Sequence, residues 1–410
     1  MDLNYTPEYE AFRAELRDFL ESNRDRWPRR PAMVPTDEMK AWQQMLIARG
    51  YTARTIPREY GGFGADPDVL KSRIIGEEFA AAGAPPGLAG QGISMLVPTL
   101  LELGTEEQKQ QWIEPTLRGD VIWCQGYSEP GAGSDLASLA TRGEEDGDDF
   151  VINGQKIWTS TAKQAQMMFC LVRTEPDAPR HKGISYLLFP MDTPGIEVRP
   201  LVTMTGDAEF NEVFFTDVRV PRSSIVGNRG EGWMVANATL QHERGMLGDP
   251  NAAGSRLRKI IDMMQEETID GSTLMDNPLL RDRLLQLQAR MLTMQFNGYR
   301  TLTAKSKGQS AGLASLVVKL QGCELKHRIA ELAIDVLGEL GLLYGSSPRI
   351  RNHGNWQRSY MFDLGLIIGG GTAQIQKNII SEHGLGMPRE PKAAPPRPAP
   401  PQPAKREETS

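Results

Sequence analysis

Residues 127–135, Tyr-Ser-Glu-Pro-Gly-Ala-Gly-Ser-Asp, have the composition of a tight turn that presents polar groups to its surroundings. The proline and the two glycines allow the chain to reverse, so that hydroxyls and backbone N–H groups point outward. Such a turn can hydrogen-bond a phosphate or the polar edge of a planar cofactor. An ordinary turn between two strands has the same composition, so this stretch alone does not decide between the two interpretations.

A second stretch, residues 153–160, supplies an aromatic plane and two hydroxyls, from Trp158, Thr159 and Ser160. An isoalloxazine ring needs an aromatic face to stack against and polar groups along its edge. A tryptophan in a predicted strand more often belongs to the core. The pairing of the two stretches, rather than either one alone, therefore indicates a flavin site.

A third candidate is Glu243 in residues 240–245, Leu-Gln-His-Glu-Arg-Gly, where Arg244 follows it directly. A carboxylate in a dry pocket can act as a general base, whereas a solvated helix glutamate would only pair with a neighbouring cation. The His242-Glu243 pair does not form a zinc-binding H-E-x-x-H motif, because position 246 is methionine. Near the other end of the chain, Gly369-Gly370-Gly371-Thr372 breaks a helical pattern where a ligand or another backbone can approach closely.

From end to end, apart from a proline-rich tail, the chain resembles the acyl-CoA dehydrogenases. Several motifs carry the resemblance in the family's order and spacing, and they lie at residues 57–64, 128–135, 153–160, 230–233 and 371–376. The resemblance implies an α+β multidomain fold: an N-terminal helical domain, a central β-barrel or sandwich domain and a C-terminal four-helix bundle. It also implies FAD as the cofactor, in a cleft between the domains.

The resemblance assigns expected roles residue by residue. The expected cofactor-binding residues are Gln125, Tyr127, Ser128, Gly133, Ser134, Trp158, Thr159, Ser160, Thr372 and Gln374. Thr372 and Gln374 would contact the adenosine portion, and the others would lie along the flavin. The substrate-binding residues are expected to be Ser134, Gln241 and Arg244.

The reaction that the resemblance implies is oxidation of an acyl-CoA to the trans-2-enoyl-CoA, with α-proton removal and hydride transfer from Cβ to flavin N5. In most members the catalytic carboxylate directly precedes the Gly-Thr that corresponds to Gly371-Thr372, but here that position is Gly370. A minority of the family places the base on an earlier helix directly before an arginine, as in Glu243-Arg244. We therefore interpret Glu243 as the base. The missing side chain at Gly370 favours a branched or bulky acyl group, such as a steroid side chain.

Two departures from the family's pattern concern subunit assembly. Residues 269–274 contain neither the arginine nor the Phe-Gly that normally reaches a neighbouring subunit's FAD pyrophosphate. The family's Gln-x-x-Gly-Gly motif reads Asp335-Val336-Leu337-Gly338-Glu339, whose acidic side chains would repel a pyrophosphate. Some bacterial steroid-degrading members, which this chain resembles in its Gly-Gly-Gly-Thr and its His-Glu-Arg, are heterotetramers in which one subunit gives the base and the other the phosphate-binding residues. One hypothesis is therefore that this chain is the base-bearing subunit. A homotetramer remains open, as does an electron-transfer flavoprotein as the electron acceptor.

Two other functions remain as alternatives: an acyl-CoA oxidase on the same scaffold, and a non-catalytic partner subunit. A nucleic-acid-binding member would need a basic face, but the net charge is −6 with both signs interspersed.

The longest apolar runs, such as residues 364–368, fall far short of the ~18 residues of a membrane span. The N-terminus does not look like a signal or transit peptide. The three cysteines (Cys124, Cys170 and Cys323) form no metal pattern and are expected as free thiols, so we expect a cytoplasmic protein.

The elements that must position these residues follow from periodicity. Residues 1–121 read as helical, residues 122–229 as a small β-domain, residues 230–388 as a helical bundle, and residues 389–410 as a disordered Pro- and Ala-rich tail. Asn153-Gly154 is expected to form a hairpin turn between residues 150–152 and a strand at residues 156–159. Thr105 is expected to cap a helix.

Overall fold

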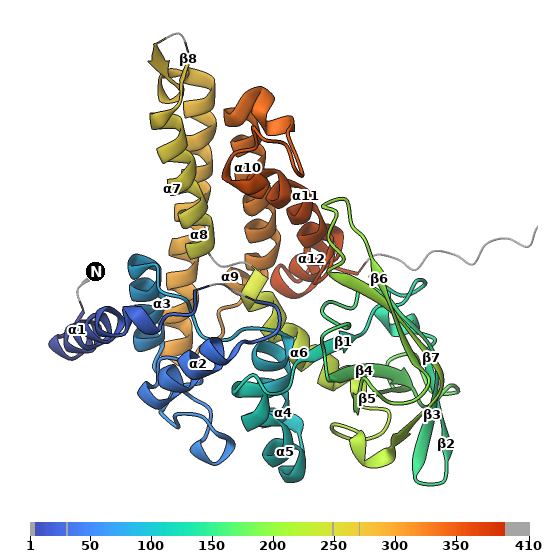
Figure 1. Cartoon of the computed structure of the whole chain (residues 1–410). Helices are drawn as coiled ribbons and strands as arrows, with labels where there is room; N and C mark the ends of the chain where they lie inside the picture. Colours follow the sequence, from blue (N-terminus) through green and yellow to red (C-terminus); the bar gives the residue numbers. More distant parts are fainter. Residues whose placement is uncertain (1–4, 30–31, 248–249, 270, 390–410) are drawn as a thin grey trace, which may run out of the picture.

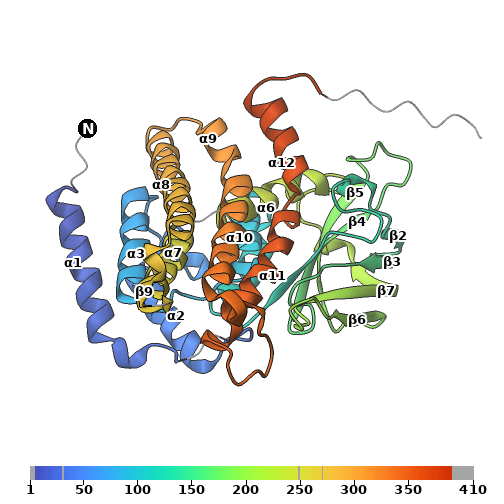
Figure 2. The same ribbon diagram turned by 90° about the horizontal axis from the view of Figure 1, so that it is seen from above.

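The computed structural model of the protein describes residues 5–29, 32–247, 250–269 and 271–389; within these ranges the side chains at 243–247, 250–252, 269 and 305–306 are outside the description. All of the predicted tail beyond residue 389 also lies outside the described residues. Figure 1 shows that the first and the last part of the sequence are helical and that the middle part forms a sheet. Figure 2 shows the sheet at one end of the molecule and α1 at the other.

The N-terminal part is helical, as the periodicity predicts. Its helices are α1 (Pro7–Ser22), α2 (Asp37–Arg49), α3 (Val69–Ala82), the π-helical turn η3 (Gly92–Leu96), α4 (Val97–Leu103) and α5 (Glu106–Leu117). The predicted cap is confirmed, because Thr105 accepts from the Gln108 N–H at 3.2 Å while the Gln108 side chain accepts from the Thr105 N–H. Leu16, Leu20 and Trp42 form the centre of the core between α1, α2 and α3.

The central part is one seven-stranded sheet with the strand order β1-β4-β2-β3-β7-β6, in which β5 pairs with β4. The strands are β1 (Trp123–Gly126), β2 (Arg142–Asp146), β3 (Asp149–Lys156), β4 (Met167–Arg173), β5 (Ile184–Pro190), β6 (Ile196–Leu201) and β7 (Phe210–Pro221). β1 and β4 pair in parallel, while β3–β7 and β4–β5 pair antiparallel. The continuous apolar runs of β4 and β5 are buried on both faces.

The predicted hairpin at Asn153-Gly154 is wrong. β3 runs through both residues, and its register with β7 shifts between Ile152 and Gly154, which marks a β-bulge. Asn153 is held by Asp217 of β7, whose backbone N–H and side chain both bond the Asn153 side chain at 3.0 Å. The actual β2–β3 turn is made by Gly147, at φ 64°, and Asp148.

The C-terminal part is helical, as predicted. Its elements are α6 (Gly232–Leu247), α7 (Pro250–Glu266), the short strands β8 (Thr268–Ile269) and β9 (Ser272–Thr273), α8 (Pro278–Ser306), α9 (Leu313–Leu316), α10 (Val318–Leu337), α11 (Asn355–Ile368) and α12 (Ala373–Ile379). α7, α8, α10 and α11 pack as a four-helix bundle (Figure 1). The apolar stripes of α8 and α10 meet in its core, with Leu284 and Leu287 against Ala333 and Leu337.

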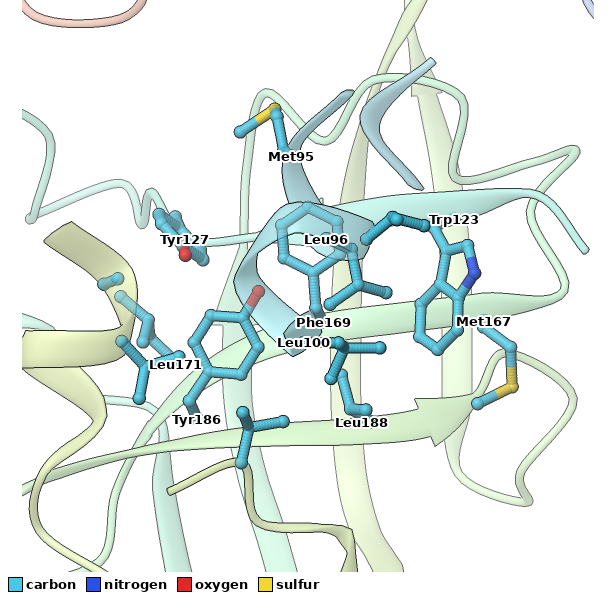
Figure 3. Close-up of a cluster of buried hydrophobic side chains, with 14 of the residues drawn as sticks. Met95, Leu96, Leu100, Trp123, Tyr127, Met167, Phe169, Leu171, Tyr186 and Leu188 are labelled. Atoms are coloured by element: carbon cyan, nitrogen blue, oxygen red, sulfur yellow. The ribbon is translucent and has the colours of Figure 1, made fainter. Parts of the chain in front are cut away.

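The three parts share a second core. This cluster combines side chains of α4, of β1, β4 and β5, and of α6, among them Leu100, Phe169 and Val235. Figure 3 shows its centre, where Tyr186 and Leu188 of β5 approach Leu96 and Leu100. α6 is therefore fixed by packing against both the N-terminal helices and the sheet.

One ion pair ties the bundle together across α7 and α11. Arg256 Nη1 lies 2.6 Å from Asp363 Oδ2, and Asp363 is fully buried. Removing one partner of a buried pair leaves an uncompensated charge, so Asp363→Ala or Arg256→Met is expected to destabilise the bundle by about 3 kcal/mol. Thermal unfolding measures this as a lowered midpoint. Glu197→Ala, which breaks the exposed pair with Arg199, is the control and should barely change it; an equal effect of the two would contradict the prediction.

Candidate active site

The turn at residues 127–135 is anchored to β3 by a buried ion pair between Glu129 and Lys156. Lys156 Nζ lies 2.7 Å from Glu129 Oε1, and the Lys156 side chain is fully buried. Glu129 also accepts from the backbone N–H groups of Ala140 at 2.6 Å and Thr141 at 2.9 Å. Burial alone would raise the pKa of Glu129, but the Lys156 charge and these hydrogen bonds hold it below its usual value. The turn is thus anchored to β3 by a satisfied carboxylate.

The two sequence motifs come together in space. The Ile157 N–H donates to the Ser128 carbonyl at 2.9 Å, and Lys156 Nζ donates to the Tyr127 carbonyl at 3.3 Å. β3 ends at Lys156, so the predicted strand at residues 156–159 is wrong beyond its first residue. The segment that follows is pinned to β7 by reciprocal backbone hydrogen bonds of 3.0 Å between Thr159 and Asn211.

Trp158 is not a core tryptophan. Its side chain is 58% exposed, its backbone lies at φ 59°, and its ring touches Phe210 edge-on, at 6.0 Å between centroids. A bulky residue at positive φ is a strained conformation that the surroundings must impose, and such residues cluster at functional sites. Here the reciprocal bonds of Thr159 hold the chain on the C-terminal side of Trp158.

Thr159 carries an unpaired polar atom. Its hydroxyl is buried and has no hydrogen-bond partner in the part of the chain that the structure describes. Buried polar groups of folded proteins are nearly always satisfied, so this hydroxyl indicates a missing partner. An unsatisfied hydroxyl in the residue that follows an exposed tryptophan fits a planar aromatic cofactor with a polar edge, and so the residues present fit a flavin.

The outer side of the turn is open. Gly131, Gly133 and Ser134 are exposed, and a β-carbon added at either glycine would meet nothing within 4 Å. Ser128 and Ser160 are half-buried, and Tyr127 is buried beneath the turn. Gln125, on β1, accepts from Gln91 Nε2 at 3.5 Å. Eight predicted cofactor residues therefore belong to two connected segments beside the end of β1: Gln125, Tyr127, Ser128, Gly133, Ser134, Trp158, Thr159 and Ser160.

The predicted base and its neighbours lie on α6. The backbone places Glu243 and Arg244 in the last two turns of this helix, while their side chains lie outside the described residues. Gln241 is exposed. His242 Nε2 lies 3.4 Å from Glu102 Oε1, which links α6 to α4 at this level. The catalytic role of Glu243 and the substrate contacts of Arg244 and Gln241 stay predictions.

The Gly-rich segment before α12 is held by its own contacts. Gly370 lies at φ 64°, where a residue with a side chain would be strained. The Thr372 hydroxyl caps α12 by accepting from the Ile375 N–H at 3.2 Å, and Gln374 is exposed. Gln376 Nε2 donates to the Gly370 carbonyl at 3.1 Å. The adenosine contacts expected of Thr372 and Gln374 stay predictions.

One predicted repulsive group is neutralised. Asp335, which was expected to repel a pyrophosphate, forms an ion pair with Arg283 of α8. Glu339 is exposed in the 3-10 turn that follows α10.

Within the described residues, no group of three or more His, Cys, Asp or Glu side chains could hold a metal ion, and the three cysteines are free and buried. None of the described helices is long and apolar enough to cross a membrane.

Known proteins share this whole arrangement. The N-terminal, middle and C-terminal domains of the acyl-CoA dehydrogenases match residues 6–120, 124–218 and 230–385, respectively. The acyl-CoA dehydrogenase IpdE1 of Mycobacterium tuberculosis is 42% identical over 360 residues, which cover 87% of this chain and 90% of that protein.

Two solved structures have the same fold along nearly the whole chain. A chain of the ChsE4-ChsE5 complex of Mycobacterium tuberculosis superposes with a TM-score of 0.79 at 33% identity, over 95% of this chain and 100% of the other. A chain of the Tcur3481-Tcur3483 steroid acyl-CoA dehydrogenase gives 0.78 at 31% identity, with the same coverage. The chain therefore belongs to the acyl-CoA dehydrogenase family of flavoprotein oxidoreductases.

Proposed function

We propose that the protein binds FAD and converts an acyl-CoA to its trans-2-enoyl-CoA, with Glu243 as the base that removes the α-proton. One observation carries the proposal. The Ser128–Ile157 hydrogen bond joins the two motifs directly before two consecutive residues, Trp158 with an exposed indole and Thr159 with an unpaired buried hydroxyl. An aromatic plane beside an unsatisfied hydrogen-bonding group is the pairing that an isoalloxazine ring requires.

In this proposal each segment has one task. FAD, when bound, supplies a two-electron acceptor for the hydride that leaves Cβ. Trp158, Thr159 and Ser160 would line one part of the isoalloxazine. Gln125, Tyr127, Ser128, Gly133 and Ser134 would lie along the flavin, with Ser134 also contacting the substrate. The Glu243 carboxylate takes the proton from Cα, with Arg244 and Gln241 beside the acyl-CoA. Thr372 and Gln374 contact the adenosine portion.

We further propose a branched or bulky acyl group, such as a steroid side chain. Gly370 adds no side chain at the position where most family members carry their carboxylate. The Tcur3481-Tcur3483 enzyme, one chain of which shares this fold at 31% identity, is a steroid acyl-CoA dehydrogenase. That enzyme and the ChsE4-ChsE5 complex are each named after two different chains, which supports a heteromer here as well. In this proposal the chain is the base-bearing subunit of a tetramer. An electron-transfer flavoprotein is the proposed electron acceptor.

Anaerobic bleaching of the bound flavin tests the function. The purified protein, alone and co-expressed with a candidate partner of the same family, is mixed with straight-chain, branched and steroid side-chain acyl-CoAs. Bleaching with formation of the enoyl-CoA is the expected result, fastest with the bulky thioesters. A flavin that stays oxidised with every thioester and in both preparations would contradict dehydrogenation. Oxygen consumption without an added acceptor would identify an oxidase instead.

The Thr159 hydroxyl gives a prediction for cofactor affinity. Thr159→Val keeps the shape of the side chain and removes the unpaired hydroxyl, so the FAD-free protein should unfold at the same temperature or higher. FAD binding should weaken by about 1–3 kcal/mol, because the cofactor loses a buried hydrogen bond. Titration with FAD followed by flavin fluorescence measures the dissociation constant. Thr193→Val, which removes a remote exposed hydroxyl, is the control; unchanged affinity in Thr159→Val would contradict this contact.

A further inference from the structure

Three buried hydroxyls meet where the three parts of the chain join. They belong to Thr99 of α4, Thr239 of α6 and Tyr186 of β5, and we call them the hydroxyl cluster. The Thr99 and Thr239 hydroxyl oxygens are 3.0 Å apart, and Thr239 Oγ1 lies 3.4 Å from Tyr186 Oη. Thr99 Oγ1 also lies 2.7 Å from the Met95 carbonyl oxygen, and Thr239 Oγ1 lies 3.0 Å from the Val235 carbonyl oxygen. Each threonine hydroxyl has a single hydrogen, which it shares between the carbonyl of its own helix and the other hydroxyls.

The surroundings of the hydroxyl cluster are apolar. All three side chains are fully buried, in a core that includes Leu96, Leu100 and Val235. A buried hydroxyl costs free energy unless it is hydrogen-bonded. The two threonines can bond carbonyls of their own helices, but the contacts of Thr239 with Thr99 and with Tyr186 form only while α4, α6 and β5 keep this relative arrangement. Apolar packing alone tolerates sliding and rotation better than directional bonds do. The hydroxyl cluster therefore specifies how α6 is rotated.

α6 is fixed to β5 at a second point, near its start. A β-carbon at Gly232 would lie 2.4 Å from the Ser185 carbonyl carbon and 2.6 Å from the Tyr186 nitrogen, so the helix backbone rests directly on the strand. Just before α6, the Val226 N–H donates to the Tyr186 carbonyl at 2.9 Å. Gly232 and Thr239 are separated by roughly 10 Å along the helix axis, and two anchors at that spacing fix both its direction and its rotation.

Position 243 lies one helical turn after Thr239, on the same face of α6. Tyr186 also contacts Tyr127, which begins the turn at residues 127–135. The two rings meet edge-on, with centroids 6.2 Å apart and an interplanar angle of 84°. Figure 3 shows Tyr186 rising from its strand beside Tyr127, with its hydroxyl at the far end of the ring. One side chain thus contacts both the helix that carries position 243 and the turn that is proposed to hold the flavin.

We propose that Thr99, Tyr186 and Thr239 are positioning residues, which set the place of Glu243 relative to the flavin and the substrate Cα. The inference rests on the proposed function, because it assumes that Glu243 is the base. A displacement of about 1 Å in a reacting group can cost 10²-fold in rate, so a small rotation of α6 suffices for a large effect. The hydroxyls themselves do not touch the substrate.

The test separates proton removal from oxidation. A 3-thia-acyl-CoA has sulfur in place of Cβ and cannot donate a hydride, but its α-protons still exchange with deuterated solvent when a base is in place. Exchange is followed by mass spectrometry in the flavin-loaded holoprotein for wild type, Thr239→Val, Tyr186→Phe and Thr239→Ser. Thr116→Val is the matched control, since it removes a buried hydroxyl whose hydrogen-bond partners, Trp112 and Trp123, belong to the same core but not to α6.

We expect roughly 10- to 100-fold slower exchange in Thr239→Val and Tyr186→Phe, with unchanged flavin content and thioester affinity. Thr239→Ser should recover most of the rate, and Thr116→Val should exchange as wild type even where its thermal midpoint falls equally. Wild-type exchange in Thr239→Val, or equal slowing in Thr116→Val, would overturn the positioning role alone. If wild type neither exchanges the α-proton nor bleaches with any acyl-CoA, the proposed function fails, and the positioning role falls with it.

Discussion

Glu243→Gln is expected to lower the rate of substrate-dependent flavin bleaching by about 10²–10⁴-fold, the usual contribution of a general base. The glutamine side chain keeps the size of glutamate but cannot accept the α-proton. Flavin content and thioester affinity should stay close to wild type, since neither depends on the charge at this position in the proposed site. Rapid-mixing absorbance of the flavin under anaerobic conditions measures the rate.

A neighbouring carboxylate supplies the control. Glu102 of α4 is exposed and pairs with His242, the residue next to Glu243, so Glu102→Gln perturbs the same region without removing the proposed base. It should bleach at a rate within a few-fold of wild type. If Glu243→Gln bleaches as fast as Glu102→Gln, the relocated-base hypothesis is wrong, and the carboxylate must come from elsewhere, such as a partner chain.

The second large effect is expected at the buried Glu129–Lys156 pair. Lys156→Met leaves the Glu129 carboxylate buried without its cation, which costs about 3–5 kcal/mol of stability in such pairs. Because the pair also anchors residues 127–135, the variant should lose FAD before it unfolds. Flavin fluorescence during thermal denaturation resolves the two events. The double variant Glu129→Gln/Lys156→Met should be less destabilised than Lys156→Met alone, and a larger loss in the double variant would contradict this account.

The same pair predicts a pH dependence with a definite sign. The pKa of Glu129 is lowered in the folded protein, so its contribution to stability is fully present above the unfolded pKa of about 4.3. It is lost as the pH falls through the lower folded pKa, where the carboxylate must take up a proton. Wild-type protein should therefore release flavin more steeply below about pH 4.3 than Glu129→Gln does. Parallel acid titrations of both proteins would show the difference, and coincident curves would refute it.

Long periodic segments and their ends could be predicted from the sequence, because their signals are local. The Thr105 cap, the apolar stripes of α8 and α10 and the continuous apolar runs of β4 and β5 each depend on residues within one element. The dipeptide Asn153-Gly154 has the local composition of a hairpin turn, but Asp217 on another strand supplies its hydrogen bonds and makes it a bulge. A local pattern contains no information about that partner.

The supports of the site were missed for the same reason. Glu129 and Lys156 are 27 residues apart, and Thr99 is 140 residues from Thr239. A lysine near the end of a strand and threonines within helices are unremarkable one by one, and only their contacts make them informative. One signal was present: Lys156 shares the inward phase of β3 with Phe150 and Ile152, which predicts a buried cation in need of a partner. Trp158 stays a predicted flavin-site residue, and its exposure follows from a backbone conformation that composition does not reveal.

The exposed indole also has an optical consequence. Of the seven tryptophans, all within the described residues, Trp158 alone is largely exposed, while Trp42, Trp123 and Trp356 are buried and Trp27, Trp112 and Trp233 are half-buried. In the cofactor-free protein, the emission that a water-soluble quencher can reach therefore comes mainly from Trp158. A flavin stacked on this ring would extinguish that emission by energy transfer and shield it from the quencher. The intrinsic fluorescence of Trp158 would therefore report how much of the protein has bound the cofactor, without an added label.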